Sequence, residues 1–139
     1  MSEHERVMLD MSATLLHHGH IQLIEKAAAY GSIVIGLTTD DEILEHKKYR
    51  PELTYRQRET ILKALRSVSD VVPTPWLITE EILDKYQIDL LVHGDDNKNE
   101  ISPSRLLVLP RTKNISSTLL REKALISLQM IADATDDLS

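Results

Sequence analysis

The sequence predicts an α/β fold built on a doubly wound, parallel, five-stranded sheet with helices on both faces. Short aliphatic and β-branched runs alternate along the chain with segments of helical periodicity, which is the pattern of successive β-α-β units. Polar residues follow several of these runs, at the position where open α/β sheets bind ligands. The 139 residues are expected to form one domain, 1–139, with an acidic end that frays from about residue 133.

Composition narrows the class of protein. The chain is 42% hydrophobic and 27% charged, no apolar run approaches the roughly 18 residues of a membrane span, and residues 1–5 do not resemble a signal peptide. The absence of cysteine excludes disulfides and thiolate metal sites, and it suits the cytoplasm. A net charge of −6 argues against nonspecific nucleic-acid binding, whereas residues 45–66 hold seven Lys/Arg against three Glu. This local basic excess favours a small anionic ligand.

Five short apolar runs are the expected strands. They lie at residues 7–11, 32–37, 71–72, 90–92 and 106–109. The second run, Ser-Ile-Val-Ile-Gly-Leu, is β-branched and short, as a buried parallel strand should be. Proline follows the third and the fifth runs and is expected to end them.

The expected helices lie between these strands. The first, residues 18–30, carries apolar residues at helical spacing and stops at Gly31. Capping boxes at Thr39 and Thr54, each with Glu or Gln three residues later, predict that two more helices begin there. The helix after Thr39 is expected to end near His46.

Three apolar residues are expected on the inner face of the helix after Thr54: Ile61, Leu62 and Leu65. A further helix is expected at residues 78–86, and the last begins near residue 116. The last helix carries one apolar stripe, formed by Leu120, Ala124, Leu128 and Ile131.

Three of the six histidines lie at the turn between the first expected strand and the first expected helix. On a helix that begins near His18, His17 and His20 face the same point, while Gly19 lets a ligand approach the backbone. Two imidazoles beside the helix N–H groups make a donor array for phosphate oxygens, able to stabilise charge that grows on a phosphoryl group. Two other interpretations stay open: the histidines cap the helix, or they bind zinc.

Further polar residues are expected at the same edge of the sheet. Residues 93–96 follow the fourth strand, and Arg111, suited to bidentate phosphate binding, follows the fifth. The hydroxyls of residues 116–118 suit the outer phosphates of a triphosphate. Ordinary N-capping by these hydroxyls, and a turn role for Asp95 and Asp96, are the alternatives.

The order and spacing of these motifs resemble the HxGH cytidylyltransferases, a superfamily that includes the glycerol-3-phosphate and choline-phosphate enzymes. The resemblance covers about residues 6–124, and RTxxISST marks the cytidylyl branch, whereas adenylyltransferases share HxGH. The chain is similar in further detail to the nucleotidyltransferase module attached to some phosphoenolpyruvate mutases. The motifs are His17-x-Gly19-His20, the Lys47-Lys48 loop, Tyr55 with Arg58, His93-Gly94-Asp95-Asp96, and Arg111-Thr112-x-x-Ile115-Ser116-Ser117-Thr118.

The resemblance implies a Rossmann-like fold and an enzyme that joins CTP to a phosphorylated alcohol, such as glycerol 3-phosphate, or to a phosphonate. The acceptor would attack CTP directly and in line, and pyrophosphate would leave. Mg²⁺ would arrive with CTP, and no residue is assigned as a metal ligand. His17 and His20 would stabilise the transition state, and Lys47 or Lys48 would neutralise the α-phosphate and the attacking group. The other implied contacts are with the nucleotide, at Gly19, Asp95, Arg111, Thr112, Ile115, Ser116, Ser117 and Thr118, and with the acceptor, at Arg58 and Trp76.

Thr14 is the main departure from the family pattern, because the family has an aspartate there, near the metal and the ligand phosphates. Two alternatives therefore stay open: a catalytically weakened nucleotide-binding or regulatory module, and an adenylyltransferase that uses ATP. The expected partners are CTP and a small phosphate- or phosphonate-bearing acceptor, with no nucleic acid and no membrane. A homodimer is expected, since the striped last helix has apolar surface to cover.

Overall fold

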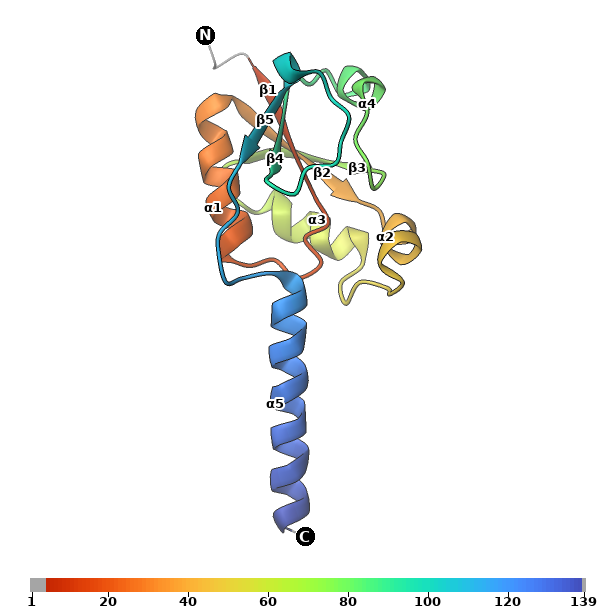
Figure 1. Cartoon of the computed structure of the whole chain (residues 1–139), viewed down its shortest axis with the longest axis vertical. Coiled ribbons are helices and arrows are strands. Elements are labelled where there is room, and N and C mark those ends of the chain that lie inside the picture. The colour runs from red at the N-terminus through yellow and green to blue at the C-terminus, as the bar shows by residue number, and fades with distance from the viewer. Residues whose placement is uncertain (1–4, 139) are drawn as a thin grey trace.

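Five parallel strands form the centre of the computed structural model, which describes residues 5–138 (Figure 1). They lie in the order β3-β2-β1-β4-β5, so the predicted doubly wound sheet is confirmed. The strands are β1 (Arg6–Met11), β2 (Ser32–Thr38), β3 (Val68–Thr74), β4 (Leu90–Gly94) and β5 (Leu106–Leu109). The helices are α1 (His18–Ala27), α2 (Asp40–Lys47), α3 (Tyr55–Lys63), α4 (Glu80–Lys85) and α5 (Ser117–Leu138), with 3-10 turns η2 (Ala28–Tyr30) and η3 (Pro103–Arg105).

Residues 1–4 and 139 lie outside the described residues. Of residues 1–5, the segment that does not resemble a signal peptide, only residue 5 is therefore described. Within the described part, no helix is both long enough and apolar enough to cross a bilayer.

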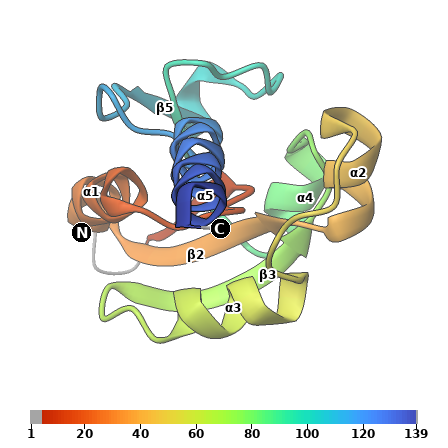
Figure 2. The ribbon, with the colours of Figure 1, turned by 90° about the horizontal axis from the view of Figure 1, so that it is seen from below.

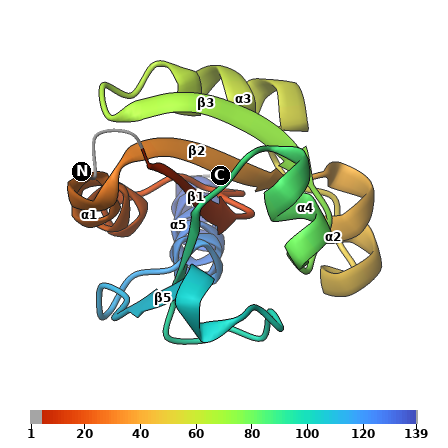
Figure 3. The same ribbon diagram turned by 90° about the horizontal axis from the view of Figure 1, so that it is seen from above.

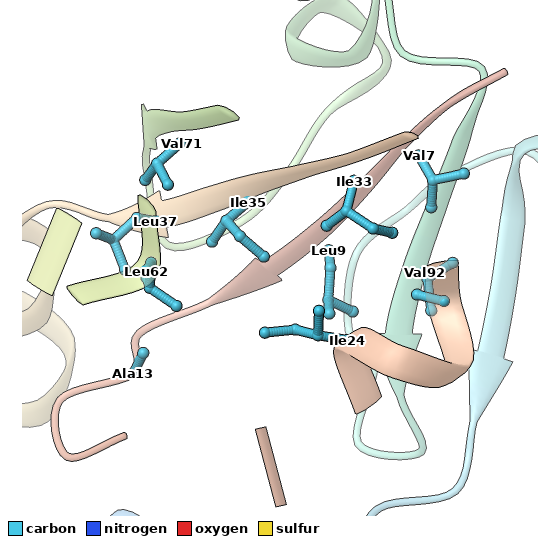
Figure 4. Close-up of a cluster of buried hydrophobic side chains, with 11 residues drawn as sticks. Val7, Leu9, Ala13, Ile24, Ile33, Ile35, Leu37, Leu62, Val71 and Val92 are labelled. Carbon is cyan, nitrogen blue, oxygen red and sulfur yellow. The ribbon is translucent and has the colours of Figure 1, made fainter. Parts of the chain in front are cut away.

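The sheet carries an apolar cluster on each face because successive residues of a strand point to opposite sides. Val7 and Leu9 of β1 belong to one cluster, which α1 and α3 cover (Figure 4). Met8 between them belongs to the other, which Leu83 of α4 covers. Figures 1 and 3 show α2 and α4 on the side of the body away from α1. Because all strands are parallel, their carboxyl ends meet at one edge, where α5 also begins.

Strand β3 extends through Pro73 to Thr74, although the sequence predicts that proline ends it. The strand lies at the edge of the sheet, so the missing N–H of proline breaks no internal ladder. The fourth helix is shorter than predicted, since Thr79 accepts a hydrogen bond from the Ile82 N–H and α4 begins only at Glu80.

The two predicted capping boxes have different outcomes. Thr54 caps α3 as predicted, and Gln57 returns a hydrogen bond to its backbone N–H. Thr39 makes no side-chain cap on α2, so the prediction of a capping box there is wrong. On α3, Leu62 is buried whereas Ile61 is exposed, because the turn of the helix carries Ile61 off the inner face.

Helix α5 leaves the body of the protein and projects away from it (Figure 1). Figure 2, seen from below, shows it end-on in the middle of the view. Only its first turn is near other elements, and every residue from Glu122 to Thr135 is exposed. The helix continues to Leu138, through the acidic segment expected to fray.

Candidate active site

A pocket of about 430 Å³ opens at the carboxyl edge of the sheet. Its walls come from the ends of β1, β2 and β4 and from the first turns of α1 and α5. Most of the predicted site residues line it: His17, Gly19, His20, Lys47, Trp76, Arg111, Thr112, Ile115, Ser116, Ser117 and Thr118. Segments far apart in the sequence therefore meet where the sequence predicts a ligand site.

His17 and His20 cap α1 with their imidazole rings. The Nδ1 atom of His17 accepts a hydrogen bond from the Gly19 N–H at 3.1 Å, and the Nδ1 atom of His20 accepts one from the His17 N–H at 3.1 Å. Each accepting Nδ1 carries no proton, so the proton of each neutral ring lies on Nε2. Capping and phosphate donation, two separate interpretations of the sequence, are compatible because they use different nitrogens.

Both imidazoles are held in the neutral form. Burial lowers the pKa of His20 to about 3, and the neighbouring His17 and Arg111 act in the same direction. Burial also lowers the pKa of His17, together with His18 and Arg111. The two ring centroids lie 3.9 Å apart, too close for two positive charges to be favourable. The pair therefore offers two neutral N–H donors.

Gly19 is required by this close packing. A Cβ atom there would lie 2.9 Å from Cε1 of His17 and 3.1 Å from Cγ2 of Ile115. The same holds at the end of β4, where a Cβ on Gly94 would lie 2.6 Å from Nε of Arg111. The two glycines thus let His17 and Arg111 lie flat against the backbone of the pocket wall.

The first turn of α5 is fixed to the segment before α1. Ser117 Oγ donates to the Leu15 carbonyl at 3.0 Å and accepts from the Leu15 N–H at 3.3 Å. Ser116 Oγ accepts from the Leu119 N–H, so the capping role of this serine is observed. Arg111 is half exposed and pairs with Asp96 at 3.0 Å. The N-terminus of α5 and the cation of Arg111 together favour an anion in this part of the pocket.

A second polar cluster lies at the end of β4. His93 Nδ1 is 2.5 Å from Oδ1 of Asp10, and Asn99 Nδ2 donates to the other Asp10 oxygen at 3.4 Å. Burial opposes the charge on His93, but the hydrogen bond and charge of Asp10, with Asp96 nearby, raise its pKa. The pocket therefore holds one histidine whose pKa is raised and two whose pKa is lowered.

The third wall is the segment from α2 to α3. Lys47 Nζ lies 5.6 Å from the Trp76 ring centroid, and the Trp76 ring stacks on His46 at 5.0 Å. Arg121 of α5 reaches this segment, where it binds both carboxylate oxygens of Glu52 at 2.7 and 2.8 Å. The same guanidinium donates to Thr14 Oγ1 at 2.6 Å. Arg121 thus joins α5, the loop after α2 and the turn before α1.

Arg58 does not reach the pocket, so the prediction that it binds the acceptor is wrong. Its side chain is 1% exposed. It donates to the carbonyls of Ser12, Thr38 and Leu53 and pairs with Asp40 at 2.6 Å. The Arg58 guanidinium, bound to three carbonyls and a carboxylate, therefore has a structural role beside the site.

Two other predicted site residues lie outside the pocket wall. Lys48 is the left-handed C-cap of α2, and its Nζ donates to the Glu45 carbonyl, so Lys47 is the lysine that lines the pocket. Asp95 is exposed beyond the wall, whereas the neighbouring Asp96 lines it.

Several residues of the pocket wall were not predicted from the sequence. Asp10 is the clearest example, since it stands inside the first apolar run and its role depends on His93, 83 residues away. Other additions to the wall are Tyr49, Lys98, Asn99 and Arg121. The position of Asp10 near the carboxyl end of a strand is the one available hint.

Comparison with known proteins gives a consistent result. The profile of a family described as cytidylyltransferase-like matches residues 14–123. The glycerol-3-phosphate cytidylyltransferase of Bacillus subtilis is 32% identical over 114 residues, which cover 78% of this chain and 88% of that protein. The ethanolamine-phosphate cytidylyltransferase of Mus musculus is 38% identical over 93 residues, 66% of this chain. The chain spans about a quarter of the length of the ethanolamine-phosphate relatives that it matches, 23–29%.

A solved structure shares the fold. The lipopolysaccharide core biosynthesis protein from Thermoplasma volcanium GSS1 superposes with a TM-score of 0.67 at 16% sequence identity. The match covers 78% of this chain and 98% of that one. The two chains therefore share the fold.

Proposed function

We propose, since this chain belongs to the cytidylyltransferase-like family, that it transfers a cytidylyl group from CTP to a phosphorylated alcohol or a phosphonate. An oxygen of the acceptor's phosphate or phosphonate group forms a bond to the α-phosphorus. The bond from the α-phosphorus to the bridging oxygen breaks, and pyrophosphate leaves with the electron pair. The acceptor carries its own nucleophile, so the protein needs to supply only positioning and charge stabilisation.

The arrangement of His17 and His20 is the observation that carries this proposal. Both rings are neutral and held by backbone N–H groups through Nδ1, which leaves Nε2–H on each as a donor. Donors fixed before the substrate arrives need no reorganisation as negative charge grows on the phosphoryl oxygens. We assign the pair to the transition state at the α-phosphorus.

The remaining pocket residues fit the ends of the same reaction. Arg111, the Thr118 hydroxyl and the backbone N–H groups of the first turn of α5, which begins at Ser117, suit the β- and γ-phosphates that leave. Lys47, on the opposite wall beside Trp76, suits the α-phosphate and the incoming phosphate.

Magnesium fits this pocket through the nucleotide. Mg²⁺ prefers one or two carboxylates together with substrate phosphates and water. Asp96 lines the wall with its side chain 54% exposed and would offer such a carboxylate by giving up its ion pair with Arg111, whereas Asp10 is buried and held by His93 and Asn99. When bound, the ion would neutralise part of the triphosphate charge.

The acceptor is expected to be small and to bear a phosphate or phosphonate. Relatives named for glycerol 3-phosphate and for ethanolamine phosphate support a phosphorylated alcohol. The cysteine-free sequence supports a cytoplasmic location as part of this proposal.

The direct test is release of pyrophosphate from CTP with a panel of acceptors. The panel contains glycerol 3-phosphate, phosphoethanolamine, phosphocholine, 2-aminoethylphosphonate and 2-hydroxyethylphosphonate. Turnover with at least one acceptor is expected, and ATP in place of CTP should give little. A preference for ATP would show an adenylyltransferase. Normal CTP binding without turnover for any acceptor would contradict transfer.

Thr14 favours a second candidate, a weakened nucleotide-binding module. Its hydroxyl is buried and accepts from Arg121, which is already paired with Glu52. A large gain of turnover in Thr14→Asp would support loss of an ancestral acid. Unchanged turnover would show that threonine is compatible with the chemistry.

A further inference from the structure

The loop between α2 and α3, residues 48–54, lies at the base of α5 and forms part of the pocket wall (Figure 1). Lys47, which ends α2, and Tyr49 in the loop both line the pocket. The far end of the loop is held at Leu53, whose carbonyl accepts a hydrogen bond from α3. Between Tyr49 and Leu53, every hydrogen bond that the described residues make to another element comes from Arg121 of α5. The middle of this wall therefore depends on one residue of a helix distant in the sequence.

Arg121 binds the loop through its guanidinium group. Its Nε donates to one carboxylate oxygen of Glu52 at 2.7 Å and its Nη2 to the other at 2.8 Å, while its Cζ lies 4.5 Å from the centroid of the Tyr49 ring. The hydrogen bond between the two charged groups lowers the pKa of Glu52 and raises the pKa of Arg121. A bidentate pair of this kind fixes orientation as well as distance. Arg121 therefore determines where the Glu52 carboxylate lies.

Thr14 fixes the same guanidinium to the turn before α1. This residue is 3% exposed, and its hydroxyl accepts a hydrogen bond from Nη2 of Arg121 at 2.6 Å. The hydroxyl is neutral, so it binds the guanidinium without competing for its charge, whereas a carboxylate in this place would draw Arg121 away from Glu52. The contact with Thr14 thus gives Arg121 a fixed base from which it holds the loop.

The face of α5 that carries Arg121 also borders the proposed triphosphate end of the pocket. Ser117, Thr118 and Arg121 are spaced by three and four residues, so they lie on one face of the helix, and all three line the pocket. From Glu122 to Thr135 every residue is exposed. Arg121 is therefore the residue farthest along the described part of α5 that lines the pocket.

We propose that Arg121 and Glu52 are positioning residues: their pair holds the loop against α5 and thereby sets where Lys47 and Tyr49 lie in the pocket. This inference rests on the proposed cytidylyl transfer, in which Lys47 suits the α-phosphate and the incoming phosphate. Tyr49 stands two residues after Lys47, so loss of the pair releases the segment that carries both. The Glu52 side chain is 46% exposed, and exposed ion pairs add little to global stability, so the loop should open while the fold stays intact.

The first experiment compares three variants in a steady-state assay of pyrophosphate release, with the acceptor that gives turnover. Glu52→Gln should raise the KM of the acceptor about fivefold and Arg121→Gln about tenfold, because the arginine variant also loses the contact with Tyr49. The affinity for CTP, measured by calorimetry, and the melting temperature should change little, since the triphosphate end of the pocket does not depend on the loop. The double variant should lose no more than Arg121→Gln alone.

Two further variants test whether the pair itself is responsible. Exchange of the two charges, Arg121→Glu together with Glu52→Arg, restores an ion pair and should recover part of the lost acceptor affinity. Arg121→Glu alone, which places two carboxylates together, should not. Glu122→Gln is the matched control, since this exposed glutamate neighbours Arg121 but does not line the pocket, and its acceptor KM should equal that of the wild type.

The second experiment needs no turnover. Hydrogen exchange followed by mass spectrometry reports how often the backbone of residues 48–54 opens. In Glu52→Gln and Arg121→Gln this segment should exchange about five- to tenfold faster than in the wild type, in parallel with the rise in KM. The strands β1 and β4 should keep their protection in both variants.

Three results would contradict the proposal. A lower acceptor KM in Glu52→Gln would show that Arg121 binds the substrate itself and that Glu52 restrains it. Additive losses in the double variant would show that the two residues act separately. Unchanged exchange of residues 48–54 in both single variants would show that the pair does not hold the loop. A wild-type chain without turnover would instead contradict cytidylyl transfer, and the exchange measurement would still decide whether the pair holds the loop.

Discussion

The start of α1 and the end of β4 line one pocket, yet the pKa values of their histidines are shifted in opposite directions. At α1, backbone N–H groups occupy Nδ1 of His17 and His20, and burial keeps both rings neutral. At β4, the carboxylate of Asp10 holds His93 and favours its charge. The type of partner, an N–H group or a carboxylate, decides which form of the ring is stable. The same residue type thus has its pKa lowered in one part of the pocket and raised in another.

The largest expected effect comes from removing the buried arginine of α3 that binds the chain just after β1 and at the end of β2. Arg58→Ala leaves three carbonyls and Asp40 without their buried partner and should lower the free energy of unfolding by about 3 kcal/mol. Urea denaturation measures this loss. Arg56→Ala, at an exposed arginine of the same helix, is the control and should change the free energy of unfolding little. Equal effects of the two substitutions would contradict a structural role for Arg58.

The second prediction separates capping from catalysis at α1. His17→Asn and His20→Asn keep a side-chain acceptor in place of Nδ1 for the helix N–H groups but leave no donor at the position of the imidazole Nε2. Each should leave the melting temperature almost unchanged and lower kcat by about 10²–10³, the cost of losing one oxyanion donor. A parallel loss of CTP affinity, measured by calorimetry, would argue against a transition-state role.

A smaller effect is expected at β4. His93→Gln keeps a hydrogen-bonding side chain but removes the charge, and should lower kcat/KM by about tenfold, the cost of one charge-assisted hydrogen bond. Asp95→Asn, outside the pocket wall, is the matched control. No loss in His93→Gln would show that the charge of this ring serves stability alone.

The finest distinction between the two regions lies in their response to pH. The raised pKa of His93 gives a stabilisation that is complete below pH 6.5 and is lost as pH rises through the folded pKa. The lowered pKa of His20 acts with the opposite sign, since its contribution is present above pH 6.5 and is lost as pH falls toward about 3. Titration of the imidazole signals by NMR should show both, and Asp10→Asn should abolish only the shift of His93.

The fold was predictable because its strands are buried on both faces and therefore read as short apolar runs. The meeting of residues 17–20, 93–96 and 111–118 follows from parallel strands, whose carboxyl ends share one edge. The prediction for Arg58 failed for a physical reason. Its partners are mostly backbone carbonyls of Ser12, Thr38 and Leu53, which any residue type can supply, so the sequence carries no mark of them.

Finer choices between neighbours also depended on three-dimensional detail. Lys47 and Lys48 look equivalent in sequence, but the left-handed turn at Lys48 ends α2 and directs the two side chains differently. Asp95 and Asp96 differ in the same way, by their order in the turn after β4. The role of Asp10 depends on its contacts with His93 and Asn99, which are brought beside it only by the fold.

The continuity of α5 sets a rotational phase between the pocket and the outer surface. Ser117 and Arg121 fix the helix at its base, where they bind Leu15, Thr14 and Glu52. A one-residue insertion after Arg121 would turn the outer part by about 100° and move it by about 1.5 Å, with no change in the pocket. An insertion of seven residues would restore the direction of the outer side chains almost fully while lengthening the projection. The number of residues after Arg121 therefore sets the direction, relative to the pocket, in which the outer side chains of α5 point.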